Sequence, residues 1–388
     1  MRLAADSGLW STGPGTTATP LAAVLEVSGA VLSWTIDDPP GEASAQITFT
    51  DVSRADWLWR ILGESGHVAL TSALASAADG LQSIELTGVG IVPGSVDPLR
   101  RLAIGHWLRR WWPASRQDGI AALDRALLDV EVALLTVGAQ GFFTDDTLDS
   151  DVAELLAPHA AALITYVRSD DARIVDLVRA GAGIADEVGI EEIGWPELHA
   201  AIDDSSALAT AKPAPPSGRR DDYALAAGSD AGLGRTGGGA TIARGVASIK
   251  WSAVPPGIFD AAEATVEWGV EMAGTATTAV VRAAVIGPDP ATGVAVQLRS
   301  GAIGSTGTLD ADGRAILPLV DTQQRPLPEQ AAWNHDWPAT SVIIGAEISD
   351  VTESRETRER VRRLARLRLD QPGDDAFLAE ILASESVY

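Results

Sequence analysis

The five histidines are the side chains of this chain most suited to metal binding or acid–base chemistry: His67, His106, His159, His199 and His335. None begins an H-E-x-x-H motif, none is paired as H-x-H, and there is no cysteine to complete a zinc site. His199 and Asp203 stand four residues apart on an expected helix and could share a metal ion. A solvated or capping role explains both residues without one, so we expect no metal site.

Motifs for nucleophilic catalysis and nucleotide binding are missing or lie in the wrong context. The G-x-S-x-G turn does not occur, and neither Lys212 nor Lys250 follows a glycine with Ser or Thr after it, so there is no phosphate-binding P-loop. Gly232, Gly234 and Gly237 match G-x-G-x-x-G, but no strand precedes them, as dinucleotide binding requires. We therefore expect no catalytic residues and no cofactor.

Two acidic clusters carry the residue type that calcium prefers. They are Asp145, Asp146, Asp149 and Asp151 in TDDTLDSD, and Asp310 and Asp312 in DADG. The first lacks the central glycine and the distal glutamate of an EF-hand and suits a helix N-terminus, where carboxylates meet the positive end of the dipole. The second is typical of a hairpin turn, with Gly313 free to take a positive φ. Neither predicts a metal ion.

The first 203 residues predict a small sheet followed by helices. Residues 21–50 are β-branched and partly alternating, which indicates two or three strands. Asp51 or Ser53 then begins a helix carrying Trp57 to Leu62, and a second helix follows at 68–78. A further helix begins at Asp97 and places Ile104, Trp107, Leu108 and Trp111 on one buried stripe. Other helices are expected at 120–136, 151–167, 172–182 and 195–202, with Asp149 or Ser150 and Asp171 as caps.

A Pro-rich and then Gly-rich segment separates these helices from a region of period-two patterning. Six strand-like segments follow it, in the order ASIKWSAV, ATVEWGVEM, TAVVRAAVI, GVAVQLRS, GTLDADGRAILPLV and SVIIGAEI. Strands at this spacing predict an antiparallel sandwich. The fold class is thus multidomain α+β: a mostly helical α+β domain at 1–203, a Pro/Gly-rich linker at 204–244, an antiparallel β-sandwich at 245–350, and an Arg-rich amphipathic helical tail at 351–388.

Residues 308–320, TLDADGRAILPLV, resemble the strand-turn-strand of transthyretin-like and carboxypeptidase-regulatory-like β-sandwich domains, in which a D-x-D-G-type turn leads into an A-x-L-P-like strand. The resemblance is carried by about a dozen residues and applies to 245–350 alone. It implies an adhesive or accessory module without catalytic residues of its own.

Composition narrows the class of partner. The net charge of −24 disfavours nucleic acid, because affinity for a phosphate backbone comes mainly from Lys and Arg. The first ten residues lack the features of a secretion signal, and no apolar run approaches 18 residues, so we expect a cytoplasmic protein that does not bind membranes. The absence of cysteine excludes disulfides and leaves the redox compartment undetermined.

Two features favour contact with a protein partner. The helix expected from Thr352 to Leu369 has an arginine face made of Arg355, Arg358, Arg362 and Arg366. This face either lies in solvent, supported by Glu–Arg pairs four residues apart, or binds an acidic surface on another protein or on the chain's own acidic domains. The segment Trp333 to Pro338, WNHDWP, sets two indoles in a polar loop, where they either plug the end of the sandwich or anchor an interface.

We therefore predict a non-enzymatic accessory or adaptor protein that binds a protein partner through the sandwich and the C-terminal helix. The candidate contact residues are Trp333, His335, Trp337, Arg355, Arg358, Arg362 and Arg366. Two alternatives stay open. One is an enzyme whose Asp, Glu, Arg and His site in the N-terminal domain shows no motif. The other is a small-molecule or carbohydrate sensor that uses the Trp333–Trp337 loop, since paired indoles stack on sugar rings. The sequence does not indicate an oligomeric state.

Overall fold

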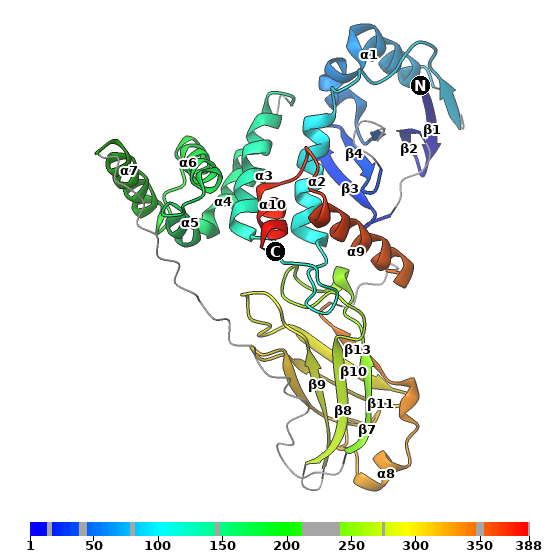
Figure 1. The fold of residues 1–388 in the computed structure, drawn as a ribbon. Helices are drawn as coiled ribbons and strands as arrows, with labels where there is room; N and C mark the ends of the chain where they lie inside the picture. Colours follow the sequence, from blue (N-terminus) through cyan, green and yellow to red (C-terminus); the bar gives the residue numbers. More distant parts are fainter. Residues whose placement is uncertain are drawn as a thin grey trace.

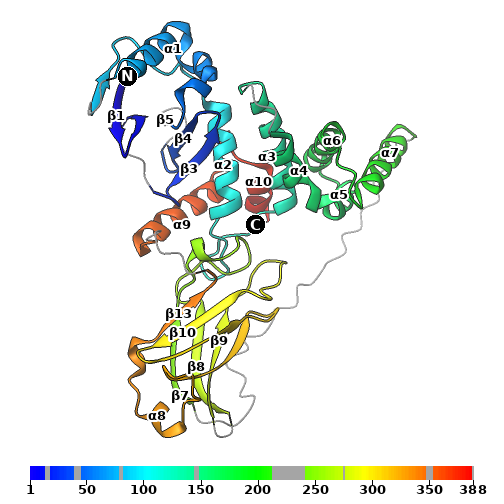
Figure 2. The same ribbon diagram turned by 180° about the vertical axis from the view of Figure 1, so that it is seen from behind.

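The computed structural model describes residues 1–13, 18–38, 45–77, 82–143, 148–211, 241–273, 276–346 and 353–386. These residues form helices and antiparallel sheets, which confirms the expected α+β class. Figures 1 and 2 show an N-terminal sheet, a row of helices beside it, and a β-rich part on the other side of the C-terminal helices.

The N-terminal sheet has more strands than the sequence pattern predicts. Its strands are β1 (Arg2–Asp6), β2 (Leu9–Thr12), β3 (Ala22–Val27), β4 (Ala30–Thr35), β5 (Gln46–Phe49) and β6 (Ser83–Glu85), in the antiparallel order β3-β4-β5-β2-β1-β6. The expected strands in 21–50 are β3 to β5. β1 and β2 were missed, although the loop between them, Ser7-Gly8, has the two positive φ values, 50° and 85°, that a tight hairpin needs.

Helices occupy most of the remaining residues up to 211. They are α1 (Trp59–Ala75), α2 (Asp97–Trp111), α3 (Arg125–Gln140), α4 (Leu148–Leu156), α5 (Ala160–Tyr166), α6 (Ala172–Glu187) and α7 (Trp195–Ala211). The two helices expected after Asp51 form one element, α1, with a kink at Gly63, where φ is 71° and ψ is 163°. No helix among the described residues is long and apolar enough to cross a membrane.

Two of the predicted N-terminal caps, Asp51 and Asp171, accept hydrogen bonds from backbone amides, and the others do not act as caps. The Asp51 side chain accepts from the Ser53 amide at the start of a short 3-10 turn, and Asp171 caps α6 by accepting from the Arg173 amide. The prediction for Asp149 and Ser150 was wrong, because both lie inside the first turn of α4. The helix expected from residue 120 begins at Arg125, since Asp124 supplies the cap and Ile120 pairs with Ser115 in a turn.

Two antiparallel sheets form the β-rich part and share one core. The four-stranded sheet has the order β12-β9-β8-β7, from β7 (Thr241–Ala247), β8 (Val266–Ala273), β9 (Ala276–Ala283) and β12 (Arg314–Pro318). The other has the order β11-β10-β13, from β10 (Ala295–Ser300), β11 (Ile303–Thr308) and β13 (Ser341–Ile344). Buried side chains of both sheets, such as Val281 and Leu298, belong to a single cluster.

Two details of this region differ from the sequence pattern. The strand expected at 247–254 is absent, because β7 ends at Ala247 and Trp251–Ala253 forms a 3-10 turn. The DADG segment is a tight turn in which Asp310 accepts from the amides of Asp312 and Arg314, and Gly313 has a φ of 74°. It joins β11 to β12, which belong to different sheets, so it is not a hairpin.

The end of the chain returns to the helices rather than trailing from the sandwich. After the short α8 (Glu329–Trp333) come α9 (Arg355–Asp370) and α10 (Leu378–Glu385). Val361 on α9, Phe377 before α10 and Ala379 on α10 are part of the buried cluster that also holds the N-terminal sheet and helices. In both views α9 lies between the N-terminal part and the sandwich, and α10 lies against α3 (Figures 1 and 2).

The predicted linker at 204–244 overlaps assigned elements at both of its ends. α7 runs on to Ala211 and β7 begins at Thr241, while residues 212–240 lie outside the described residues. The G-x-G-x-x-G segment at 232–237 also lies outside them.

Candidate functional site

The arginine face of α9 binds the chain's own acidic residues. Arg358 forms a two-pronged ion pair with Glu263, in the loop before β8, at 2.8 Å and 3.0 Å. Arg362 reaches the same carboxylate at 3.2 Å and the backbone carbonyl of Ala261 at 3.1 Å. Burial opposes ionisation of Glu263, but hydrogen bonds from Arg358 and Ser248 outweigh it and lower the pKa of this carboxyl to about 2.

The loop between α2 and α3 completes this contact. Asp118 accepts ion pairs from Arg362 at 3.3 Å and from Arg366 at 3.2 Å. From the same loop, the Arg116 amide donates to the buried carboxylate of Asp260 at 2.9 Å. α9 is therefore held by carboxylates from the sandwich side and from the helical side at once, and Arg362 touches both.

A second group of contacts fixes the first turn of the sandwich. The carboxylate of Glu353, just before α9, accepts from the amides of Trp251 and Ser252 at 2.9 Å and 2.5 Å. Arg110 on α2 donates to the carbonyls of the same two residues. The indole of Trp251 is buried within the core cluster of the helical region. Both the backbone and the side chain of this turn are thus tied to the helices, which explains why it does not form the expected strand.

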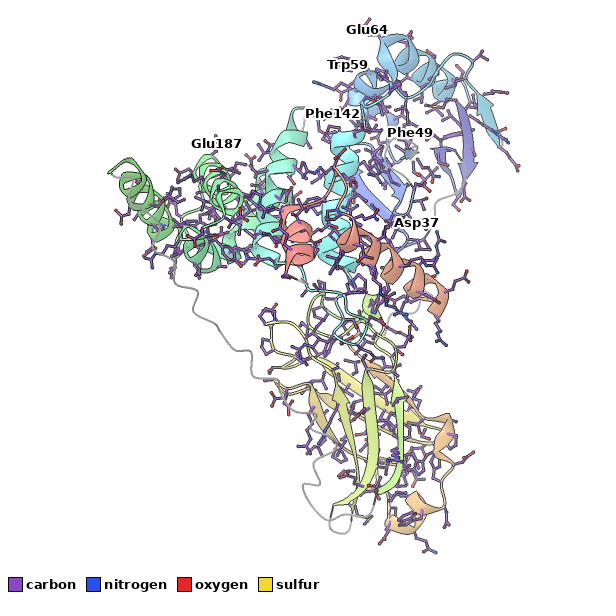
Figure 3. All side chains as sticks on the ribbon, viewed as in Figure 1. Asp37, Phe49, Trp59, Glu64, Phe142 and Glu187 are labelled. Carbon is purple, nitrogen blue, oxygen red and sulfur yellow. The ribbon has the colours of Figure 1, made fainter. Side chains whose placement is uncertain are left out.

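Of the four candidate arginines on α9, three form ion pairs within the chain and the fourth is exposed. Arg358 and Arg362 are committed to pairs within the chain, and Arg366 is paired but remains 44% exposed. Arg355, at the first turn of α9, is exposed. On the other side of α9, Arg360 forms an ion pair of 2.7 Å with Asp37. Asp37 lies in the turn after β4 and is labelled in Figure 3. The face left for another molecule is therefore smaller than the sequence suggests.

The two tryptophans of the WNHDWP segment have different environments. Trp337 is 6% exposed, and its Nε1 donates to the carbonyl of Ala332 at 2.9 Å. His335 packs edge-on against that ring and makes a hydrogen bond with Ser300 at 2.8 Å. Trp333, at the end of α8, is 51% exposed. A sugar platform made of two stacked indoles, as the sensor alternative requires, does not exist in this arrangement.

A buried polar cluster around Asp129 on α3 was not anticipated from the sequence. Its carboxylate, 4% exposed, accepts from Arg109 at 2.6 Å, from Arg125 at 2.9 Å and from His159 at 2.9 Å. Burial opposes ionisation, but the hydrogen bond from His159 and the charge of Arg109 lower the pKa of Asp129. The spacing of four residues between Arg125 and Asp129 could have predicted their ion pair from the sequence. The contact with His159, thirty residues away, could not have been predicted in this way. Both carboxylate oxygens are occupied by donors, so the cluster acts as a packing network.

His106, on α2 beside this cluster, gives the helical region a pH dependence. Burial and the charge of Arg109 lower the pKa of His106 to about 4. An unfolded histidine binds a proton near pH 6.5, so between pH 6.5 and 4 the unfolded state gains a proton that the folded state does not, and stability falls as pH falls. We expect His106→Gln to reduce that loss by about 2 kcal/mol, measured by urea unfolding. The same variant at pH 8 isolates its packing cost. If the free energy of unfolding of His106→Gln falls between pH 6.5 and 4 as steeply as that of the wild type, His106 is not the source of the pH dependence.

The other acidic residues and histidines considered as metal ligands do not gather into one group where the structure describes them. His199 pairs with Asp186 at 3.4 Å rather than with Asp203. Asp149 lies in the first turn of α4 and accepts from Gln140, while Asp145 and Asp146 lie outside the described residues. Within the described ranges, no group of three or more metal-ligating side chains gathers at one point.

An exposed aromatic side chain that the sequence pattern did not single out lies at the opposite end of the molecule from Trp333. Trp59, at the start of α1, is 47% exposed, and the Arg60 guanidinium lies 4.9 Å from its ring centroid and 6.0 Å from that of Phe142. Figure 3 shows Trp59 and Phe142 on neighbouring elements. Its neighbour Trp57 is buried, so the WLW sequence alone does not distinguish the two indoles.

Comparison with known proteins gives no family for this chain: no family model, curated protein or solved structure matches it. The resemblance of residues 245–350 to transthyretin-like domains therefore stays a prediction.

Proposed function

We propose that this chain is a non-enzymatic adaptor that binds a protein partner through the end of its sandwich farthest from the helices. The observation that carries the proposal is the exposed indole of Trp333. The helix that ends with this residue, α8, lies at that end in Figures 1 and 2. A half-exposed tryptophan offers a large, stiff surface whose burial stabilises a complex at little entropic cost.

The C-terminal helix takes a different part in this proposal from the one its charge pattern suggests. Arg358 and Arg362 support the adaptor function by bracing the sandwich against the helical region. Arg355 is exposed for a partner, and Arg366 is partly exposed while it stays paired with Asp118. A braced sandwich presents Trp333 in a fixed orientation, which lowers the entropic cost of binding.

The domain division that accompanies this proposal is a helical α+β unit at 1–203, a linker at 204–244, the sandwich at 245–350 and the helical tail at 351–388. The tail works with the first unit, because Val361 and Phe377 share its core. We place the adaptor in the cytoplasm.

The two tryptophans of the WNHDWP segment test the proposal in opposite ways. Trp337→Ala removes a buried ring and should cost about 3–5 kcal/mol of stability. Trp333→Ala should change stability by less than about 0.5 kcal/mol and abolish capture of the partner from native cytoplasm. Thermal unfolding and affinity capture measure the two effects.

A matched control is Ile316→Ala, which removes another apolar side chain of the sandwich that is 58% exposed, on β12. A partner that is retained by Ile316→Ala and lost with Trp333→Ala would support the proposal. If the full chain captures no partner, or if Trp333→Ala captures the same proteins as the wild type, the adaptor function at this end of the sandwich is wrong.

A further inference from the structure

An open hollow of about 750 Å³ lies where the four-stranded sheet meets the loop between α2 and α3. Its lining includes Gln117 from that loop, Glu267 at the start of β8, Arg282 near the end of β9, Asp312 in the turn before β12, and Arg314 at the start of β12. Its size is that of a small-molecule site. β8 and β9, which carry Glu267 and Arg282, are labelled in Figure 1.

Two arginines lie side by side in this hollow. Arg282 and Arg314 are directly opposite each other in the antiparallel pairing of β9 with β12. Cross-strand neighbours on one face have Cβ atoms about 5 Å apart, and like charges in that position destabilise a sheet. Such a pair is normally offset by carboxylates. Here, within the described part of the chain, neither guanidinium is in an ion pair, although Glu267 stands opposite Arg282 on β8.

A second observation concerns Arg314 alone. Its Nε is removed from solvent and has no hydrogen-bond acceptor among the residues that the structure describes. Buried donors in folded proteins nearly always have a partner, so this N–H is a donor still open to an acceptor. A guanidinium presents its N–H groups as a planar fork that matches the two oxygens of a carboxylate.

We propose that this hollow binds a small carboxylate ligand, whose oxygens accept hydrogen bonds from Arg282 and Arg314. A single negative charge fits better than two, because Glu267 and Asp312 also line the hollow and repel a dianion more strongly. The buried carboxylate of Asp260, also in the lining, accepts from the amides of Arg116, Gln117 and Ala262, and it forms no ion pair with either arginine in the described part of the chain. The site is independent of the partner surface at Trp333.

Isothermal titration of the full chain tests the site with acetate, butyrate, benzoate, inorganic phosphate and an acetylated tripeptide amide with one internal glutamate, at constant ionic strength and pH 7. We expect saturable binding of at least one monocarboxylate. Arg282→Gln and Arg314→Gln should each weaken it about tenfold or more, the effect of losing a charged hydrogen bond. Glu267→Gln should strengthen it, because a repelling charge is removed.

The control is Arg299→Gln, which removes an exposed arginine of β10 outside the hollow and should leave binding unchanged. Without ligand, Arg282→Gln and Arg314→Gln should unfold at the wild-type temperature or above, since each relieves repulsion. No saturable binding of any monocarboxylate, tighter binding of phosphate than of every carboxylate, binding of the peptide alone, or an equal loss with Arg299→Gln would each overturn the proposal.

Discussion

Replacing Phe377 with alanine is expected to destabilise the helical region by about 3–5 kcal/mol, although only eleven residues of the 388 follow it. The ring is fully buried, and it packs so closely on α2 that a Cβ added at Gly105 would lie 2.9 Å from it. The guanidinium of Arg101 lies 5.3 Å from its centroid. Removal of the ring leaves a cavity between α2, α3 and α10 that a helix pair cannot close by small shifts.

Urea unfolding together with hydrogen exchange measured on peptides is the appropriate experiment, because it separates the helices from the sandwich. Protection of α2 and α3 should fall in Phe377→Ala. The control is Leu367→Ala on α9, where the side chain is 56% exposed and a change below about 0.5 kcal/mol is expected. Equal effects of the two substitutions would mean that the last helix is not part of the core.

Arg362→Ala is expected to cost about 3–5 kcal/mol, because it removes one partner from a buried ion network. The side chain is 7% exposed and contacts Glu263 of the sandwich, Asp118 of the α2–α3 loop and the carbonyl of Ala261. Without it, Glu263 keeps its ion pair with Arg358, and Asp118 keeps its ion pair with Arg366. The adjacent Arg363→Ala is the matched control, since that residue carries the same charge on the exposed side of α9.

A double-mutant cycle with Glu263→Gln isolates the pairwise part, and we expect a coupling of about 0.5–3 kcal/mol. The pH dependence gives an independent reading. Glu263 has its ordinary pKa near 4.5 when unfolded and about 2 when folded, so its contribution is complete above pH 4.5 and is lost as pH falls toward 2. Glu263→Gln should remove that loss. If the cycle gives no coupling energy and Glu263→Gln loses as much stability as the wild type between pH 4.5 and 2, then the sandwich and the helical region are joined by other contacts.

Both experiments bear on how the chain is divided. A C-terminal segment that follows the sandwich in sequence but completes the core of the preceding helices cannot be removed without damage to those helices. Truncation at Asp350 would delete Val361 and Phe377 from that core. Loss of a partner on such truncation would therefore not by itself assign the partner's site to the tail, and point substitutions on exposed side chains are the better test.

Local chemistry explains which predictions from the sequence were confirmed. The helix at Asp97 and the stripe through Trp107 depend on spacing within a few residues, and Trp107 is 3% exposed as expected. The cap at Asp171 and the turn at Asp310 to Gly313 are likewise set by side-chain oxygens close in sequence to the amides they accept from. The switch from helical to period-two patterning also predicted a change of element type, from the helices that end with α7 to the strands that begin with β7.

The sequence by itself determined these local elements and the existence of an arginine face on α9; only the tertiary structure decided what that face binds. Arg358 meets Glu263 from 95 positions away, and Arg366 meets Asp118 from 248. The same holds for Trp333 and Trp337, which stand in one loop with the same local signal, yet one ring is exposed and the other buried. Burial and ion pairing depend on which distant surfaces the fold brings together, and periodicity along the chain carries no information about those surfaces.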